Sequence, residues 1–197
     1  MWYHDFGDFT MKIILASAYP RRKELFADVA KDFIIEVSNA DETTPEGITA
    51  DMLPCFLSEL KAKDVAAKHP NDIVIGCDTV VIKDDRVLGK PKNTKDATEM
   101  MRFLSGSVHE VITGCYICCG DKSKGFSERT KVEFFELSDN EIEDYVTSLE
   151  PYDKAGGYGI QGKAKVFIKG IVGDYFNVVG LPVARLKREL DDFIRNL

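Results

Sequence analysis

The sequence predicts an α/β fold built on a mixed β-sheet, and three observations carry this prediction. Short apolar segments alternate with helix-length segments in the first half of the chain, which is the pattern of parallel α/β units. Two long β-rich segments, at residues 108–119 and 126–137, then follow one another across a polar turn, as in an antiparallel pair. No repeat, low-complexity tract or linker divides the 197 residues, which are enough for one sizeable hydrophobic core.

Composition argues against several classes of protein. Lys and Arg number 26 against 33 Asp and Glu, a formal net charge of −7, whereas general nucleic-acid binding needs a basic face. There is no apolar run of about 18 residues, the length of a membrane span, and the opening MWYHDFGDFT lacks the apolar stretch of a secretory signal. Five cysteines without a histidine cluster favour free thiols in a reducing cytosol over a zinc site. We therefore expect a cytoplasmic protein that binds neither nucleic acid nor membrane.

The first elements are a strand, a polar turn and a helix. Residues 11–16 (MKIILA) predict a short buried strand, and Pro20 predicts the start of a helix that runs to about residue 30. Arg21 and Arg22 fall in its first turn, where the partial positive charge of the helix N-terminus disfavours cations. Their presence there is expected if an anion binds at the turn. The alternative is two solvated arginines on a surface helix.

The next stretch contributes two charged candidates. Residues 33–37 predict a second strand, and the polar loop 38–47 after it carries Glu42. Residues 51–69 predict a long helix whose apolar i, i+4 row is interrupted by Lys61. Such a lysine usually extends its ammonium to solvent. The alternative is a charge held at the rim of a site.

A continuous apolar run at residues 73–77 predicts a central strand that is covered on both faces. The run ends abruptly at Asp78 and Thr79. Because ligands collect at the carboxyl ends of strands in open α/β sheets, Asp78 is a candidate site residue; the alternative is a helix cap or a turn residue. Residues 80–88 predict a hairpin with a charged tip, and Lys90 follows it.

The remaining elements surround a glycine-dense loop. Helices are predicted at residues 94–104, 138–149 and 181–196, and a strand at residues 166–172. Thr94 is the expected cap of the first of these helices, and a capping box at Ser138 begins the second. Residues 153–162 (DKAGGYGIQG) are too rich in glycine for a regular element. They predict a binding loop in which the backbone comes close to a ligand.

Polar candidates gather where loops meet these elements. They are Ser17, Arg21, Arg22, Glu42, Lys61, Asp78, Thr79, Lys90 and Gln161. Two carboxylates without histidine suit Mg²⁺ or Mn²⁺, and four cations suit a polyphosphate. This combination is expected of metal-assisted phosphoryl chemistry, in which a carboxylate orients or deprotonates the attacking water. The glycine-rich motif of P-loop enzymes is not present in the sequence.

Several ordered motifs resemble those of the Maf family. Residues 15–25 (LASAYPRRKEL) are similar to the family's opening pattern L-A-S-x-S-P-R-R-x-E-L, and they depart from it at Tyr19, where serine is usual. That change is expected to affect one hydroxyl contact to phosphate, although tyrosine also carries a hydroxyl. Similar segments follow in family order at residues 41–42, 57–62, 76–81, 89–91, 104–106, 153–162 and 179–182. The resemblance covers residues 11–197 as one catalytic domain and leaves residues 1–10 as an N-terminal extension.

The resemblance implies the inosine-triphosphatase-like fold, an elongated mixed sheet with flanking helices bent around a deep central cleft. It implies hydrolysis of a nucleoside triphosphate between its α and β phosphates, to the monophosphate and pyrophosphate. Asp78 is then the proton acceptor for water, and Glu42 and Asp78 hold the divalent metal. The residues that it assigns to the triphosphate are Ser17, Arg22, Lys61 and Lys90, the two lysines being part of the catalytic set.

Substrate choice within the family tracks a few positions, here Arg21, Thr79 and Gln161. Residues 158–162 (YGIQG) are similar to the branch acting on dTTP and UTP, not to the branch acting on 7-methyl-GTP and CTP. An amide such as that of Gln161 can both donate to and accept from a pyrimidine edge. Three functions stay open: a dTTP/UTP pyrophosphatase, a house-cleaning enzyme for modified pyrimidine nucleotides, and a nucleotide-sensing regulator of septum formation without turnover. Family members are often dimers, so a homodimer is one expected assembly.

Overall fold

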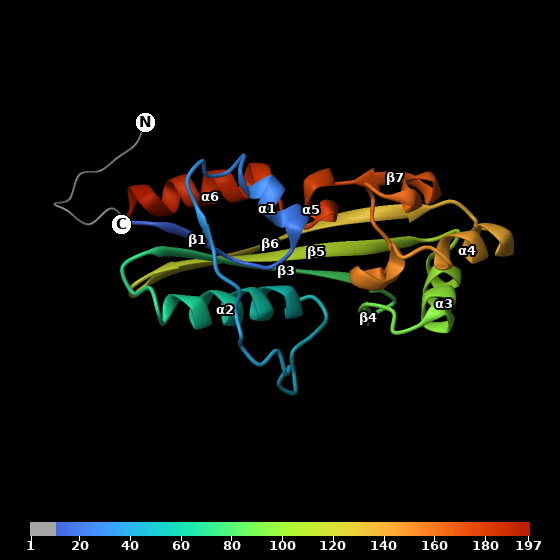
Figure 1. Cartoon of the computed structure of the whole chain (residues 1–197), viewed down its shortest axis with the longest axis horizontal. Coiled ribbons are helices and arrows are strands. Elements are labelled where there is room, and N and C mark those ends of the chain that lie inside the picture. Colours follow the sequence, from blue (N-terminus) through green and yellow to red (C-terminus); the bar gives the residue numbers. More distant parts are fainter. Residues whose placement is uncertain (1–10) are drawn as a thin grey trace.

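A seven-stranded mixed sheet runs the length of the molecule in the computed structural model, which describes residues 11–197 (Figure 1). The strands are β1 Ile13–Ala16, β2 Ile34–Ile35, β3 Ile73–Lys83, β4 Arg86–Leu88, β5 Val108–Cys119, β6 Lys122–Phe134 and β7 Ile168–Val172. Their order is β2-β1-β3-β5-β6-β7, with β4 paired to β3 beside this path. β1 pairs in parallel with β2 and β3, and the other pairs are antiparallel. The predicted α/β fold with a mixed sheet is confirmed.

Helices cover both faces of this sheet. They are α1 Pro20–Phe26, α2 Leu53–Ala66, α3 Thr94–Leu104, α4 Asp139–Val146, α5 Tyr175–Val179 and α6 Val183–Arg195, with short 3-10 helices at Pro151–Asp153, Ala155–Gly157 and Lys163–Phe167. In Figure 1, α1, α5 and α6 lie on one face, α2 lies on the other, and α3 and α4 gather near one end. Within residues 11–197, no helix has both the length and the apolar character that crossing a membrane requires.

Two large apolar clusters hold the sheet and helices together. The first lies where α1 and α6 pack on the sheet, and it includes Leu15, Ile75 and Leu186. The second joins the far ends of the long strands to α3 and α4 and includes Met101 and Phe134. All five of these side chains are almost fully buried. Each contributes on the order of 2 kcal/mol through removal from water.

The helix α2 packs directly on the sheet because two glycines leave room for its backbone. A β-carbon at Gly76 of β3 would overlap the carbonyl oxygen of Ser58, and one at Gly114 of β5 would overlap that of Pro54. Any larger residue at these positions would force the helix away from the sheet. This close approach brings Lys61, on the sheet-facing side of α2, to β3.

The central strand β3 is longer than the sequence predicts. The apolar run at residues 73–77 is only its first half, and Asp78 lies inside the strand rather than after its end, so the predicted boundary is wrong. β5 pairs with β3 continuously from Val74 to Ile82, and this pairing carries the strand through its polar residues. Apolar periodicity does not reveal such a partner, which lies about 35 residues further along the chain.

Other predicted boundaries also change. α1 ends at Phe26 rather than near residue 30, and the cap of α3 is Asn93, whose side chain accepts from the Asp96 amide at 2.9 Å, not Thr94. The capping box at Ser138 is confirmed. The short helix α5 was not predicted, since five residues are too few to show helical periodicity.

The strand boundaries shift for reasons of pairing. β2 has two residues instead of the expected 33–37, because only Ile34 and Ile35 pair with β1. The turn between β5 and β6 is two residues long, not six, since pairing continues out to Cys119 and Lys122. The predicted hairpin between β3 and β4 is confirmed.

Candidate active site

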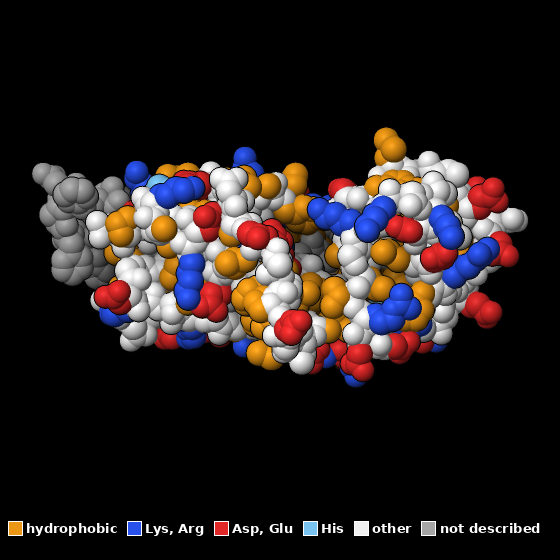
Figure 2. Space-filling view, turned by 90° about the horizontal axis from the view of Figure 1, so that it is seen from below, with side chains coloured by type: hydrophobic (Ala, Val, Ile, Leu, Met, Phe, Trp, Pro, Cys, Tyr) orange, Lys and Arg blue, Asp and Glu red, His pale blue; other side chains and the backbone are white. Residues whose placement is uncertain are grey.

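A cleft of about 510 Å³ lies beside an unpaired stretch of β3. On this edge of β3, pairing with β1 ends at Gly76 and pairing with β4 begins at Val81, so no strand within residues 11–197 covers the edge between them. Seen from the α2 side, Figure 2 shows a hollow near the middle of the molecule with apolar side chains around it. The volume is within the range of small-molecule sites, roughly 300–1,000 Å³.

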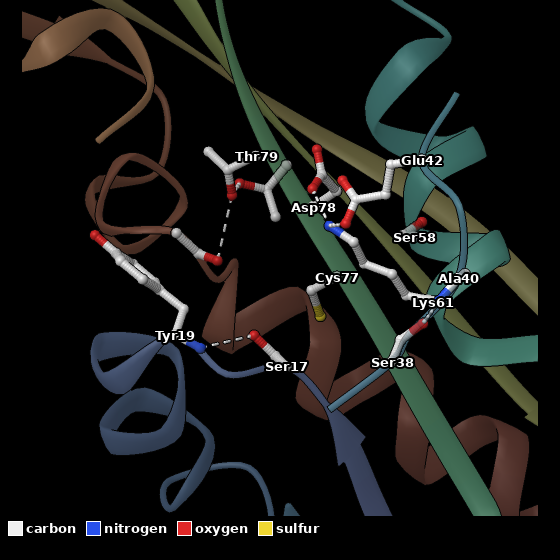
Figure 3. A network of polar contacts seen from close by, with 12 residues as sticks. Ser17, Tyr19, Ser38, Ala40, Glu42, Ser58, Lys61, Cys77, Asp78 and Thr79 are labelled. Carbon is white, nitrogen blue, oxygen red and sulfur yellow. Dashed lines mark hydrogen bonds and ion pairs between the residues drawn. The ribbon is translucent and has the colours of Figure 1, made fainter. Parts of the chain in front are cut away.

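This gap lets the cleft reach both faces of the sheet. Successive side chains of a strand point to opposite faces. Asp78 therefore faces α2, where it meets Lys61 (Figure 3). Thr79 faces α1, where it meets Arg22. Both Asp78 and Thr79 line the one cleft. We call these parts the α2 side and the α1 side of the cleft.

On the α2 side, Lys61 lies between two carboxylates. Its ammonium nitrogen is 2.6 Å from Asp78 Oδ1 and 3.3 Å from Glu42 Oε1 (Figure 3). The side chains of Lys61 and Asp78 are only 16% and 15% exposed, so solvent screens their interaction little, whereas Glu42 is 53% exposed. Two residues 17 positions apart in the sequence, on α2 and on β3, thus form the charged centre of the site.

Burial raises the pKa of the Asp78 carboxyl above its ordinary value. The nearby charges of Lys61 and Arg22 lower this pKa, and that of Glu42 raises it, but burial outweighs them. A raised pKa makes the ionised carboxylate a stronger base than an exposed aspartate. Asp78 is therefore suited to accept a proton from a water molecule.

The α2 side also has the donor set for a hard divalent cation. Because Glu42 and Asp78 both reach the Lys61 ammonium, their oxygens converge on one region. Two carboxylates suit Mg²⁺ or Mn²⁺ when the ion keeps water and takes phosphate oxygens. Among residues 11–197 there is no cluster of three or more His, Cys, Asp or Glu side chains that encloses a metal. The residues fit an ion shared with a bound phosphate better than a closed metal site.

On the α1 side, Arg22 connects three segments of the chain. Its Nε donates to the Gly180 carbonyl at 3.0 Å, and its Nη1 donates to Ser17 Oγ at 2.9 Å and to the Cys77 carbonyl at 3.0 Å. Its Nη2 donates to Thr79 Oγ1 at 3.1 Å. These bonds occupy four of the five N–H donors of a guanidinium, so only one remains for a ligand. Arg22 therefore holds the turn after β1 and the corner after α5 against β3.

The glycine-dense loop closes the other wall of the cleft. Lys154 and Tyr158 line it, although the sequence pointed only to the loop and not to these side chains. Lys154 is 7% exposed, and its ammonium donates to the Glu150 carbonyl at 2.7 Å and pairs with Asp153. The sequence signals Lys154 and Tyr158 only through the glycine content of their loop, since no local pattern marks which of its side chains line the cleft.

The loop also meets the helix across the cleft. A β-carbon at Gly159 would lie 2.9 Å from Arg21 Nη1 and 2.9 Å from Lys154 Cε. A larger residue here would require the Arg21 or Lys154 side chain to shift, because both occupy the space beside this glycine. The two walls of the cleft are therefore in contact at this point.

Most of the predicted site residues come together. Those lining the cleft are Ser17, Arg21, Arg22, Glu42, Lys61, Asp78, Thr79 and Lys90. Lys90 is exposed, consistent with a place at the rim. Gln161 is also exposed but is not part of the lining, so the structure does not bring it to the other eight.

Fold and cleft together define an α/β protein whose cleft is lined by two close carboxylates and several cations. The model of the family described as Maf-like protein matches residues 12–193, and the chain belongs to the Maf family. A "dTTP/UTP pyrophosphatase" of Bacillus mycoides (strain KBAB4) is 50% identical over 182 residues, covering 92% of this chain and 95% of that protein. A protein of the same name from Bacillus cereus (strain ATCC 10987 / NRS 248) is 48% identical over 187 residues, covering 95% and 92%.

Solved structures support the fold. The chain is similar to the Staphylococcus aureus Ham1 protein, with a TM-score of 0.52 at 16% identity over 92% of this chain and 98% of that one. It is also similar to a HAM1 protein from Coxiella burnetii, with a TM-score of 0.50 at 10% identity over 95% and 100%. At such identities the likeness establishes the fold alone. The elongated, inosine-triphosphatase-like architecture that the Maf motifs implied is confirmed.

Proposed function

We propose that this chain hydrolyses nucleoside triphosphates, chiefly dTTP and UTP, to the nucleoside monophosphate and pyrophosphate. The observation that carries the proposal is the cluster on the α2 side, where Lys61 lies 2.6 Å from Asp78 and 3.3 Å from Glu42. Relatives that are about half identical over nearly their whole length carry the name of this activity. The cluster supplies the groups that such a reaction needs.

In the proposed mechanism, Asp78 is the general base. Its buried carboxylate takes a proton from water as the oxygen attacks the α-phosphorus, and pyrophosphate leaves. Lys61 donates to Oδ1 of Asp78, which fixes the carboxylate and leaves its second oxygen for the water or a cation. Lys90 and Arg21 neutralise phosphate oxygens, and Arg22 with Ser17 shapes the turn beside them. Glu42 and Asp78 would hold Mg²⁺ or Mn²⁺, which supplies charge neutralisation of the triphosphate.

The cellular compartment, the assembly and the recognition of the pyrimidine belong to the same proposal. The five cysteines are free thiols, in keeping with a reducing compartment, and we place the protein in the cytoplasm. A homodimer stays a prediction. Recognition of the pyrimidine by Gln161 also stays a prediction, and it requires the exposed end of the loop to move toward the cleft.

A substrate panel tests the proposal. Purified protein would be given dTTP, UTP, CTP, 7-methyl-GTP, 5-methyl-UTP and pseudo-UTP with Mg²⁺ or Mn²⁺, and again with a chelator. We expect release of pyrophosphate and monophosphate, fastest with the uracil and thymine nucleotides and abolished by the chelator. Release of orthophosphate would contradict cleavage between the α and β phosphates. Faster turnover of the modified nucleotides would favour the house-cleaning role. Tight binding without turnover under every condition would favour the regulatory alternative.

A further inference from the structure

Tyr19 presents an aromatic ring to the α1 side of the cleft. It precedes the first residue of α1 and lines the cleft together with Thr79 (Figure 3). A β-carbon at Gly180 would lie 3.5 Å from Tyr19 Cε1 and 3.8 Å from Thr79 Oγ1. The ring therefore lies close to the corner after α5, near Thr79. Serine, which the opening motif usually has here, cannot provide such a surface.

The phenol hydroxyl does not replace a serine hydroxyl within the protein. Among residues 11–197, no group forms a hydrogen bond with the Tyr19 hydroxyl. The residue's hydrogen bonds are made by its backbone: its N–H donates to Ser17 Oγ at 3.3 Å, and its carbonyl accepts from the amides that begin α1. Burial raises the pKa of this phenol, so the ring stays neutral at neutral pH. The expected hydroxyl contact to phosphate stays a prediction, and the ring is the feature that the serine of the motif cannot supply.

Two guanidinium groups lie beside the ring. The carbon atoms of the Arg21 and Arg22 guanidinium groups lie 5.7 and 5.8 Å from the ring centre, within the range of cation–π contacts. Arg22 is itself held by four hydrogen bonds to the protein. The ring is thus supported by a rigid group, and it costs a ligand little to bind against a surface that is already ordered.

The two sides of the cleft differ in the chemistry of their linings. The α2 side carries Glu42, Lys61 and Asp78. The apolar residues of the wider lining include Val81, Val111, Ala155, Tyr158, Val178 and Val179, and the cations Arg21, Arg22 and Lys154 line the cleft as well. A nucleoside triphosphate has a charged end that suits the first set and a flat base whose faces suit the second. If the α-phosphate is at Asp78, the nucleoside extends through the gap in the sheet toward Thr79.

We propose that the ring of Tyr19 is a specificity-determining surface on which the pyrimidine base packs. This inference rests on the proposed function, because it takes the nucleotide as the ligand and Asp78 as the place of the reacting phosphate. It predicts that the ring strengthens binding of the nucleoside and leaves binding of the bare polyphosphate unchanged. Replacing the ring with an aliphatic side chain of similar reach removes stacking and keeps most of the buried volume.

Calorimetry with two ligands provides the test. The ligands are α,β-imido-dUTP, which is not hydrolysed, and inorganic tripolyphosphate, which has no nucleoside. Variants are Tyr19→Leu, Tyr19→Phe and Tyr19→Ser, with Tyr175→Leu as the matched control, since Tyr175 is a partly exposed tyrosine of α5 outside the cleft lining. Thermal unfolding checks that each variant folds. If Tyr19→Leu does not fold, Tyr19→Ser takes its place, because serine is the usual residue of the motif.

We expect Tyr19→Leu and Tyr19→Ser to weaken binding of the imido analogue about tenfold, the size of one base–aromatic stacking contact. Tyr19→Phe and Tyr175→Leu should remain within about twofold of the natural protein, and tripolyphosphate should bind all variants alike. Unchanged binding of the analogue by Tyr19→Leu overturns the inference. An equal loss for both ligands also overturns it, because the ring would then act through the arginines on phosphate.

The same measurements separate this inference from the proposed function. If the natural protein binds the imido analogue and Tyr19→Leu does not, while UTP is never hydrolysed, the stacking role holds and the pyrophosphatase activity fails. If UTP is hydrolysed and the ring has no effect on binding, the activity holds and the stacking role fails. If the natural protein neither binds the analogue nor hydrolyses UTP, both fail.

Discussion

The two faces of β3 at its unpaired stretch use cations in different ways. On the α2 side, Lys61 bridges the carboxylates of Glu42 and Asp78, which are the charged groups that a metal or an anion would meet there. On the α1 side, four N–H groups of Arg22 donate to neutral oxygens of the protein. Asp78 and Thr79 are adjacent in the chain, yet the alternation of the strand assigns them to these different surroundings.

This difference separates residues that take part in the reaction from residues that hold the structure. A cation that pairs with carboxylates influences whether those carboxylates are protonated, and it can respond to a bound ligand. A buried guanidinium bonded to backbone carbonyls and hydroxyls mainly holds segments together, since its partners neither titrate nor leave. Substitutions on the α2 side should therefore change the rate and its pH dependence. Substitutions of the bonded arginine should change stability first.

The largest effect is expected from Asp78→Asn. Asparagine has nearly the same shape but cannot accept a proton from water, so turnover of UTP should fall by about 10²-fold or more, the loss typical of a general base. Pyrophosphate release at saturating UTP measures it. The control is the urea unfolding curve, which should show a fold at least as stable as that of the natural protein, because the burial of an ionised group is relieved. Turnover equal to that of the natural protein would remove Asp78 as the base.

A smaller effect, on the order of 10- to 100-fold in turnover, is expected from Lys61→Met. The charge of Lys61 lowers the pKa of Asp78, so its removal raises that pKa further. Because the base works in its deprotonated form, the acidic limb of the profile of kcat/KM against pH should move to higher pH. Activity is then lost earlier as the pH falls.

The matched control for this variant is Lys63→Met. Lys63 is two residues along the same helix, is 62% exposed and pairs with Glu59 outside the cleft. It should leave both turnover and the pH profile unchanged. If the acidic limb stays in place in Lys61→Met, the contact between Lys61 and Asp78 does not govern the protonation of the base.

Local sequence patterns predict the elements of this site better than their register. The apolar run before Asp78 predicts a buried strand, and β3 begins there at Ile73. Nothing in the run reveals that β5 continues the pairing past Asp78, or that β1 and β4 leave the opposite edge bare. These features depend on partners distant in sequence, which a periodicity argument does not see.

The same limit applies to the side chains of the cleft. The ordered motifs marked Lys61 and Asp78 as site residues, but not that glycines at two positions of the sheet let α2 bring the two together. The glycine content predicts the loop but does not mark Lys154 as a lining residue, because its contact with the Glu150 carbonyl becomes visible only in the folded structure. Gln161 shows the reverse case. Its chemistry suits a pyrimidine edge, yet it is exposed and lies outside the cleft lining, which side-chain chemistry alone does not reveal.

The smallest effect on turnover, and the most direct test of the comparison, is expected from Arg22→Lys beside Arg21→Lys. A lysine has one nitrogen and cannot meet the four acceptors that Arg22 serves, so the free energy of unfolding should fall by about 1–3 kcal/mol. Arg21 is only partly buried and lines the cleft, so its replacement should change stability by less than about 0.5 kcal/mol and raise KM for UTP.

Urea unfolding and steady-state kinetics on the same two variants measure both quantities. The arginines are neighbours in one helical turn, so each variant is the control for the other. If Arg22→Lys is as stable as the natural protein but binds UTP poorly, its guanidinium is chiefly a phosphate ligand, and the α1 side takes part in binding the charged end of the nucleotide. If stability falls and KM changes little, the four bonds of Arg22 chiefly hold the turn after β1 and the corner after α5 against β3.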